Sequence, residues 1–228
     1  MKYKPLIGDQ MSGSMGGVTA SHNRGGTYFR QRAIPVNPGS PQQTVIRALM
    51  ATLTSAWFNV LTAAQRTLWE TYADNVLFID RLGDPRNIGG LGAYVGANIP
   101  RLQASATRVD AGPTIFNRGE FTLPTIASIT APTALSLTFD NTDEWANEDD
   151  SHLIVYGSRG VNPSINFFKG PYRFAATVDG NATTAPTSPA AIIMPFTLVA
   201  GQKAFIRIRV SRADGRLSSS FRDGSIVV

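Results

Sequence analysis

Residues 203–221 read KAFIRIRVSRADGRLSSSF, and this stretch carries the clearest β signal of the chain. Its first half alternates: apolar Phe205, Ile206, Ile208 and Val210 are set against Arg207 and Arg209. This alternation predicts a strand with one face inward and the other in water. Asp214-Gly215 then supplies the residues of a tight hairpin turn. We therefore expect an antiparallel β structure around this hairpin.

Similar short segments rich in β-forming residues recur on either side of this hairpin, separated by Pro, Gly, Asn and Asp. They cover residues 125–130, 134–139, 152–158, 172–178, 190–198, 203–212 and 217–228. Seven strands over about 105 residues match the size of an immunoglobulin-like or fibronectin type III-like sandwich. The chain has no cysteine for an inter-sheet disulfide, which favours the fibronectin-like version. A jelly roll remains an alternative.

Residues 40–112 have a helical pattern instead. Ser40, Pro41 and Gln43 form the start signal of a helix, and Thr62 with Gln65 forms a second one. Two apolar stripes follow these caps: Val45, Ile46, Leu49, Leu53, Trp57 and Val60, then Leu68, Trp69, Tyr72 and Val76. We expect an αα-hairpin with both tryptophans near a shared core, and a third, glycine-containing helix over residues 89–105. The glycines of that helix either permit close helix approach or make the segment partly irregular.

Residues 1–39 are rich in glycine and end in IPVNPGS. Two short β-forming stretches, GGVTASH and TYFRQRAI, flank the turn-forming NRGG and predict a β-hairpin arm. The resulting domain prediction is a basic arm over 1–39, a helical region over 40–112 and a sandwich over 113–228, which makes the fold class α+β. Residues 109–124 read as an extended linker.

Charge is concentrated at the front of the chain. Residues 1–66 carry seven Lys or Arg against Asp9 alone, whereas residues 121–228 carry nine basic and nine acidic residues. A basic arm favours contact with an acidic protein surface or, as a weaker alternative, with nucleic acid. No apolar run is long enough for a signal peptide or a membrane span, so we expect synthesis in the cytoplasm without export.

Catalytic and ligand motifs are missing. In the arm, Ser14 stands where a phosphate-binding loop requires lysine, and His22 and His152 have no ligand partner at helical spacing. The acidic run from Asp140 to Asp150 lacks the calcium-loop pattern and reads as a solvated inter-strand loop, with a bound cation as the alternative. No nucleophile elbow occurs, so we expect no enzyme, no catalytic or metal residues and no cofactor.

Four aromatic residues lie close together in INFFKGPYRF: Phe167, Phe168, Tyr172 and Phe174. Ordinary core packing with one loop is the favoured interpretation. The alternative is an exposed platform for sugar or protein, with Phe168 and Tyr172 as its candidate binding residues.

The helical region carries a recognisable pattern: Asn37-Pro38, Arg47, Trp57, then Leu61-Thr62, Gln65-Arg66, Trp69 and Tyr72-Ala73. Over residues 12–110 this pattern resembles a family of uncharacterised structural proteins encoded by tailed bacteriophages and in bacterial genomes. The resemblance implies a non-enzymatic virion protein that assembles with major capsid, neck or tail proteins, and it supplies no catalytic residues.

The first functional expectation is that the protein decorates or cements a capsid. We expect it to form homo-oligomers in the virion and not to bind a membrane. A neck, tail or fibre-attachment component is the second, and a carbohydrate or cell-surface binding module the third. The candidate partner contacts are in the arm: Arg24, Tyr28, Phe29, Arg30 and Arg32.

Overall fold

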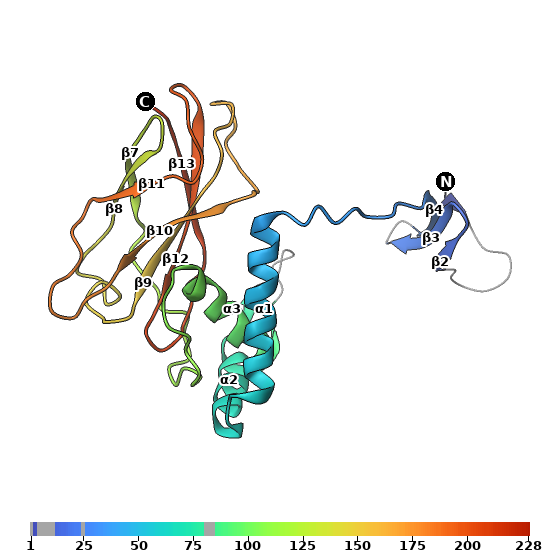
Figure 1. Cartoon of the computed structure of the whole chain (residues 1–228), viewed down its shortest axis with the longest axis horizontal. Helices are drawn as coiled ribbons and strands as arrows, with labels where there is room; N and C mark the ends of the chain where they lie inside the picture. The colour runs from blue at the N-terminus through green and yellow to red at the C-terminus, as the bar shows by residue number, and fades with distance from the viewer. Residues whose placement is uncertain (1, 4–11, 24–25, 80–84) are drawn as a thin grey trace. The chain divides into compact units, whose positions relative to one another are not determined.

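The computed structural model describes residues 2–3, 12–23, 26–79 and 85–228. The chain forms two compact units, residues 1–44 and residues 45–228. The helical region and the C-terminal strands therefore belong to one unit. Together the described elements make an α+β structure that is mostly β (Figure 1).

The first unit is an antiparallel sheet with strand order β1-β4-β3-β2. Its strands are β1 (Lys2–Tyr3), β2 (Gly13–Met15), β3 (Val18–Asn23) and β4 (Gly26–Gln31). The predicted hairpin is confirmed as the β3–β4 pair. The structure adds β2, which turns into β3 through Gly16-Gly17, where Gly16 has a φ of 56° that favours glycine.

Both predicted helix starts are confirmed. Helix α1 (Pro41–Asn59) begins after Ser40, whose hydroxyl accepts a hydrogen bond from the Gln43 amide at 3.4 Å. Helix α2 (Ala63–Asn75) begins after Thr62, and here the capping box is complete, because the Gln65 side chain also accepts from the Thr62 amide at 2.9 Å.

The predicted third helix is present as α3 (Gly89–Gln103), and its Tyr94 contacts both Trp57 and Trp69. The Tyr94 ring lies 5.5 Å from Trp57 and 5.7 Å from Trp69, centroid to centroid. Gly90 allows close approach to α2, since a Cβ there would lie 2.8 Å from the Glu70 amide nitrogen. The helical core is thus built around an aromatic triplet, with a glycine at the contact between α2 and α3.

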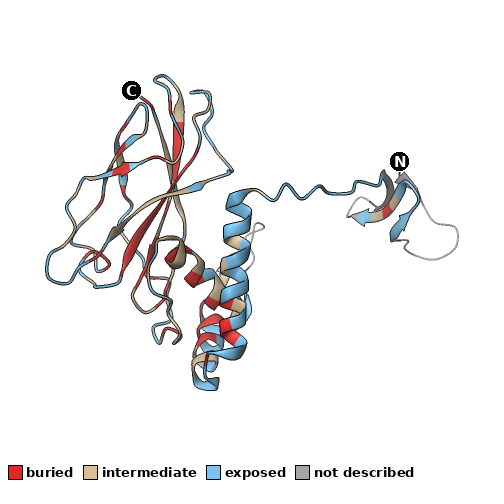
Figure 2. Ribbon diagram, viewed as in Figure 1, coloured by how far each residue is buried: buried red, intermediate tan, exposed pale blue. Residues whose placement is uncertain are grey.

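The predicted apolar stripe of α1 is only partly correct. Leu53 and Trp57 are buried, whereas Val45 is 51% and Val60 is 60% exposed. Figure 2 shows the first half of α1 almost entirely pale blue. Val60 lies beyond the helix end at Asn59, and residues 41–45 at the start of the helix are all exposed.

All seven predicted strands of the C-terminal part are present, and they form two antiparallel sheets with orders β11-β8-β7 and β10-β9-β12-β13. The strands are β7 (Thr125–Thr130), β8 (Ala134–Thr138), β9 (His152–Gly157), β10 (Arg173–Asp179), β11 (Ala190–Ile193), β12 (Lys203–Ser211) and β13 (Phe221–Ile226). A pair of two-residue strands, β5 (Phe78–Ile79) and β6 (Pro85–Arg86), lies between α2 and α3 in sequence.

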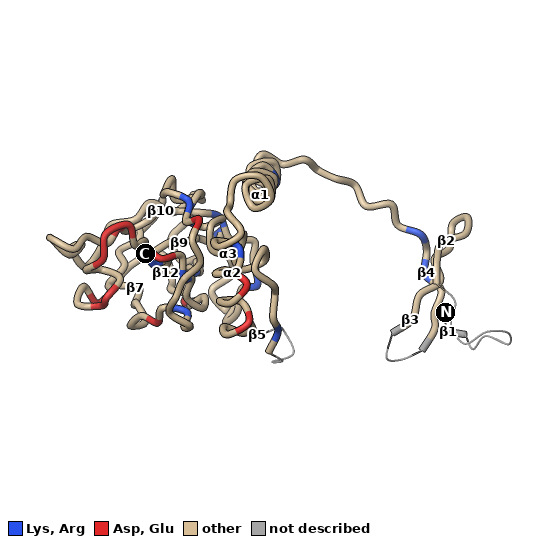
Figure 3. The backbone as a smooth tube through the Cα atoms, turned by 90° about the horizontal axis from the view of Figure 1, so that it is seen from below, with Lys and Arg blue, Asp and Glu red and all other residues tan. Residues whose placement is uncertain are grey.

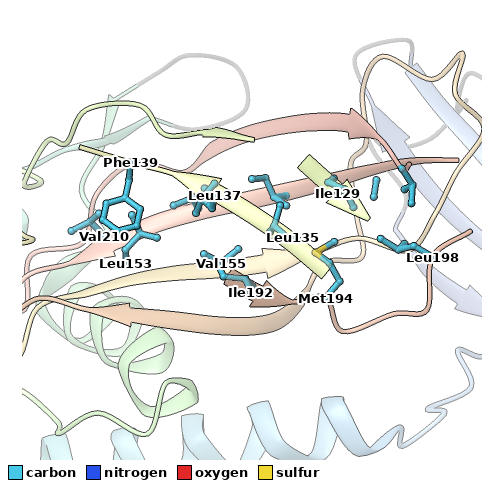
Figure 4. Packing of buried hydrophobic residues seen from close by; sticks show 14 of the residues in the cluster. Ile129, Leu135, Leu137, Phe139, Leu153, Val155, Ile192, Met194, Leu198 and Val210 are labelled. Carbon is cyan, nitrogen blue, oxygen red and sulfur yellow. The ribbon is translucent and has the colours of Figure 1, made fainter. Parts of the chain in front are cut away.

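A single apolar core lies between the two sheets (Figure 4). Leu135 and Leu137 of β8 face Val155 of β9, and Ile206, Ile208 and Val210 of β12 belong to the same cluster. The prediction for the other face of β12 is wrong in two respects. Phe205 lies on the arginine side, and Arg207 and Arg209 are half-buried rather than in water, because helix α3 and the segment 158–172 lie over that face.

Arg101 of α3 fastens the helices to the sandwich. Its fully buried guanidinium donates to the carbonyls of Thr107, Asp150 and Arg212 at 3.0, 3.1 and 2.9 Å, and to the Ser211 hydroxyl at 3.2 Å. It also pairs with the Asp150 carboxylate at 2.6 Å. The β12–β13 turn packs on the same helices, because Gly215 lies against the Trp69 ring.

Residues 109–124, which were expected to be an extended linker, form neither helix nor strand, and they are hydrogen-bonded to α2. The Trp69 indole donates to the Asp110 carbonyl and the Tyr72 hydroxyl to the Asn117 carbonyl, both at 3.0 Å. A Cβ on Gly112 would lie 2.5 Å from the Trp69 amide nitrogen.

Among the described residues, no helix taken singly has the length and apolar character to cross a membrane. Helices α1 and α2 meet that criterion only when they are joined across a bend of 118°.

Candidate binding surfaces

The arm sheet has an apolar face and a polar face. Register places Met15 opposite Val18, and Ala20 between Gly13 and Phe29, so these side chains share one face. They line a shallow hollow of about 240 Å³. Met15 is 87% exposed, and Ala20 is the one buried residue among those of 12–44 whose side chains are described. We call Met15, Val18, Ala20 and Phe29 the arm apolar face.

The predicted contact residues of the arm divide between these faces. Tyr28 and Arg30 lie opposite Ser21 and Thr19 on the polar face, whereas Phe29 belongs to the arm apolar face. Arg30 and Arg32 are exposed and Tyr28 is half-buried. Arg24 lies outside the described residues. Figure 3 shows basic positions, and no acidic ones, in the described part of β4 and the residues that follow it.

A second surface is the outer face of the sheet β10-β9-β12-β13. Register aligns Phe174, Tyr156, Arg207 and Arg222 in one row across the four strands. The Arg207 guanidinium lies 4.5 Å from the Tyr156 ring centroid, and the Tyr156 and Phe174 rings meet edge to face at 6.1 Å. The Tyr156 hydroxyl donates to Gln103 of α3 at 3.0 Å.

The segment between β9 and β10 folds over one end of this row. Phe168 stacks on Phe205 with centroids 5.8 Å apart, and Tyr172 contacts Phe168 edge to face at 5.4 Å. Gly224 on β13 leaves the room that the Phe205 ring occupies, because a Cβ there would lie 2.5 Å from the ring. We call the resulting depression of about 220 Å³ the sheet hollow. It is lined by Asn166, Phe167, Phe168, Tyr172, Lys203, Phe205, Arg222, Asp223 and Gly224.

The electrostatics of this face are unusual. Burial lowers the pKa of Arg207, and the neighbouring Arg222 lowers it further, while Tyr156 acts in the opposite direction. Burial also lowers the pKa of Arg209, and Arg207 adds to that effect. The Nε atoms of Arg207 and Arg209 are buried without a hydrogen-bond partner. In the described part of the chain, no carboxylate forms an ion pair with Arg207 or Arg209.

The favoured core interpretation of the four aromatic residues is wrong. None of them belongs to the apolar core: Phe167 is 67% exposed, and Phe168, Tyr172 and Phe174 are half-buried on the outer face. The structure brings Phe168 and Tyr172 together in the sheet hollow. The sequence prediction omitted its basic members, Lys203 and Arg222. The alternation of residues 203–209 was the available signal, because it places Lys203, Phe205 and Arg207 on one face.

The acidic run joins β8 to β9, as predicted, but its carboxylates have structural partners. Glu144 and Glu148 both pair with Arg212, which is 7% exposed. Asp143 accepts from the Thr122 amide and hydroxyl, each at 2.8 Å. No group of three or more acidic or histidine side chains in the described part of the chain is arranged to hold a metal ion.

The two histidines differ. His22 is exposed on β3, whereas His152 at the start of β9 is 8% exposed and lies between two carboxylates. Its Nδ1 is 2.7 Å from Asp179 and its Nε2 is 3.3 Å from Asp150. Because Asp150 also pairs with Arg101, His152 belongs to the network that joins α3 to the sandwich.

A larger hollow of about 530 Å³ lies beside the end of α2, lined in part by Leu77, Phe116 and Ser218. Its arginine, Arg118, is already engaged, because it donates to the Leu77 carbonyl at 2.7 Å and lies 4.3 Å from the centroid of the Phe78 ring.

Comparison with protein-family models, with curated proteins and with solved structures finds no match to this chain.

Proposed function

We propose that this chain is a non-enzymatic structural protein of a bacteriophage virion, attached to the particle through its arm. Capsid decoration or cementing is the first form of the proposal, with major capsid proteins and further copies of the chain as partners. Synthesis takes place in the host cytoplasm. The resemblance of residues 12–110 to phage structural proteins provides the class, and the arm provides the physical argument.

The observation that carries the proposal is the exposure of the arm apolar face. A small sheet needs one well-covered apolar face for independent stability. Here Met15 and Val18 are 87% and 46% exposed, and the unit buries Ala20 alone among its described side chains. A partner that covers this face, or that adds a strand to the sheet edge, would supply the missing burial and main-chain hydrogen bonds.

Charge supports a partner with an acidic surface. Residues 1–44 carry five Lys or Arg and one Asp, a net charge of +4. Arg30 and Arg32 are exposed, so they are available for long-range attraction to negative charge. Nucleic acid is the weaker alternative, and it predicts affinity that falls steeply with salt.

For the C-terminal part we propose a fibronectin type III-like sandwich. Strands β7, β8 and β11 form one sheet, and β9, β10, β12 and β13 form the other. This division of seven strands between two sheets supports the assignment. Such a module would present its outer faces to neighbours or to solvent.

Copy number in purified particles tests the proposal. Quantitative mass spectrometry should find on the order of hundreds of copies for a decoration protein, because capsid surfaces repeat the same site by symmetry. About six to twelve copies would instead favour the second candidate, a neck, tail or fibre-attachment component. Absence from virions would refute both.

The role of the arm is tested by deleting residues 1–35, which leaves Ser40 and the helix start intact. The truncated protein should remain folded in its second unit and should no longer join particles. As a matched control, the substitution Arg159→Gln removes one exposed arginine outside the arm and should leave incorporation unchanged. Normal incorporation of the truncated chain would contradict attachment through the arm.

A further inference from the structure

The sheet hollow contains an arrangement that costs stability. Arg207 on β12 and Arg222 on β13 are direct cross-strand partners. Like charges placed directly opposite destabilise an antiparallel pair. Among the described residues no carboxylate pairs with either arginine or with Lys203, which lies on the same face. Aromatic rings, rather than carboxylates, face these three cations. Local rules are broken in this way mainly at functional sites.

The hollow also has a rigid base and one available ring. Phe168 is held between Phe205 and Tyr172, and the Tyr172 hydroxyl donates to the Phe168 carbonyl at 3.0 Å. These contacts fix the base. Phe167, at 67% exposed, is the most open ring of the group, and the Arg222 guanidinium lies 5.9 Å from its centroid. An aromatic face beside a cation can bind a flat apolar surface and an anionic group together.

A neutral polar residue completes the site. Asn166 lines the same hollow, and an amide side chain both accepts and donates hydrogen bonds. A phosphodiester has no hydrogen to donate to an amide oxygen, whereas a sugar has several hydroxyl donors.

We propose that the sheet hollow binds one unit of an acidic saccharide, a sugar ring that bears a carboxylate or a sulfate. The anionic group contacts Arg222 and Lys203, the ring lies against Phe167, and the hydroxyls donate to the Asn166 side chain. At about 220 Å³ the hollow is smaller than the pockets of about 300–1,000 Å³ that hold drug-sized ligands, which suits a single ring. Single-stranded nucleic acid fits less well, because it requires a succession of exposed rings along a basic groove.

This site is independent of virion attachment. The arm could fail to join a particle and the hollow could still bind, or the reverse. Titration calorimetry on the full-length chain is the direct test, with five probes: a hyaluronan tetrasaccharide, a heparin tetrasaccharide, neutral cellotetraose, a short thymidine oligonucleotide and inorganic sulfate. We expect binding of at least one acidic saccharide, with cellotetraose at least about tenfold weaker, as loss of one charge-assisted hydrogen bond implies.

Variants locate the binding. Arg222→Gln should weaken the binding of the acidic saccharide about tenfold, and Phe167→Ala should weaken it severalfold. Both side chains are exposed, so their replacement leaves the core intact. Two arginines serve as matched controls. Arg173 is exposed on β10 next to Phe174, so it faces away from the hollow, and Arg30 belongs to the arm. Arg173→Gln and Arg30→Gln should leave the affinity unchanged.

Several outcomes would overturn the proposal. They are equal affinity for neutral and acidic tetrasaccharides, tighter binding of the oligonucleotide, loss of binding in Arg30→Gln but not in Arg222→Gln, and no heat of binding at millimolar saccharide. Binding of inorganic sulfate as tight as that of the sulfated saccharide would also overturn it, because the ring would then contribute nothing.

Discussion

Replacing Arg101 should weaken the attachment of the helices to the sandwich more than any exposed substitution. The side chain is fully buried and makes five hydrogen bonds, of which three reach backbone carbonyls and one reaches a carboxylate. Arg101→Met keeps most of the volume and removes every donor. The hydroxyl of Ser211, a fully buried residue, would then lose the donor from which it accepts, whereas the Arg212 carbonyl would keep its hydrogen bond from the Gly215 amide.

The magnitude follows from these losses. Each buried acceptor left without a partner costs about 1–3 kcal/mol, and breaking a buried ion pair costs about 3–5 kcal/mol. Asp150 is 44% exposed, so water can satisfy its carboxylate in part. We therefore expect Arg101→Met to lower the free energy of unfolding by about 2–4 kcal/mol, less than the loss of a fully buried ion pair. Arg101→Lys retains the charge but loses the planar guanidinium group, so it should recover only part of the lost stability.

Urea denaturation followed by tryptophan fluorescence and by far-ultraviolet circular dichroism measures the effect, because Trp57 and Trp69 report on the helices and Trp145 on the sandwich. If Arg101 joins the two parts, the helical signal should be lost at a lower urea concentration than the strand signal. Arg159→Met, at an exposed position, is the control and should stay within about 0.5 kcal/mol of the parent. A loss below about 1 kcal/mol for Arg101→Met would refute the reasoning.

Three further predictions concern the helical core. Gly90→Ala places a Cβ 2.8 Å from the Glu70 amide nitrogen and should lower the free energy of unfolding, measured in urea, by about 1–3 kcal/mol. Its control is Gly96→Ala, which meets open space in the same helix and should be neutral or stabilising by up to about 1 kcal/mol. The reverse order of stabilities would contradict the assigned contact between α2 and α3. Thr62→Ala removes the side-chain half of a capping box and should lower stability by about 1 kcal/mol, while Thr62→Ser should be nearly neutral; equal losses in both would exclude the hydroxyl as the cause. Burial, with a contribution from Asp214, raises the pKa of Tyr72 to about 12, so the folded state keeps a proton that the unfolded state loses near pH 10. Stability should therefore fall as the pH rises from about 10 to 12, and Tyr72→Phe should reduce this slope; an unchanged slope, followed by tyrosinate absorbance and circular dichroism, would assign the alkaline loss to other groups.

Local structure was predictable because its signals lie close together in sequence. The Thr62 capping box needs a hydroxyl and an amide side chain three residues apart, and both are present. The Asp214-Gly215 turn and the alternation before it likewise act over a few residues, and the strand pairing of β12 with β13 follows from them. Such features depend on backbone geometry that neighbouring residues alone determine.

Burial was less predictable than secondary structure. The stripe of α1 has the correct period, yet Val45 is exposed, because a period indicates which side chains share a face and not whether another element covers that face. The same limit applies to Arg207, which alternation assigned to water. The segment 158–172 and helix α3 cover it, and their position depends on contacts between residues far apart in the chain.

The sequence by itself determined the strands, the helices, their caps and the basic character of the arm, since each arises from residue types at short fixed spacings. Only the tertiary structure decided that Arg101 is the buried link between α3 and the sandwich, and that Lys203, Arg222 and Phe167 meet in one hollow. Those side chains converge through strand register and long-range packing. Their chemistry therefore becomes visible only once the sheets are assembled.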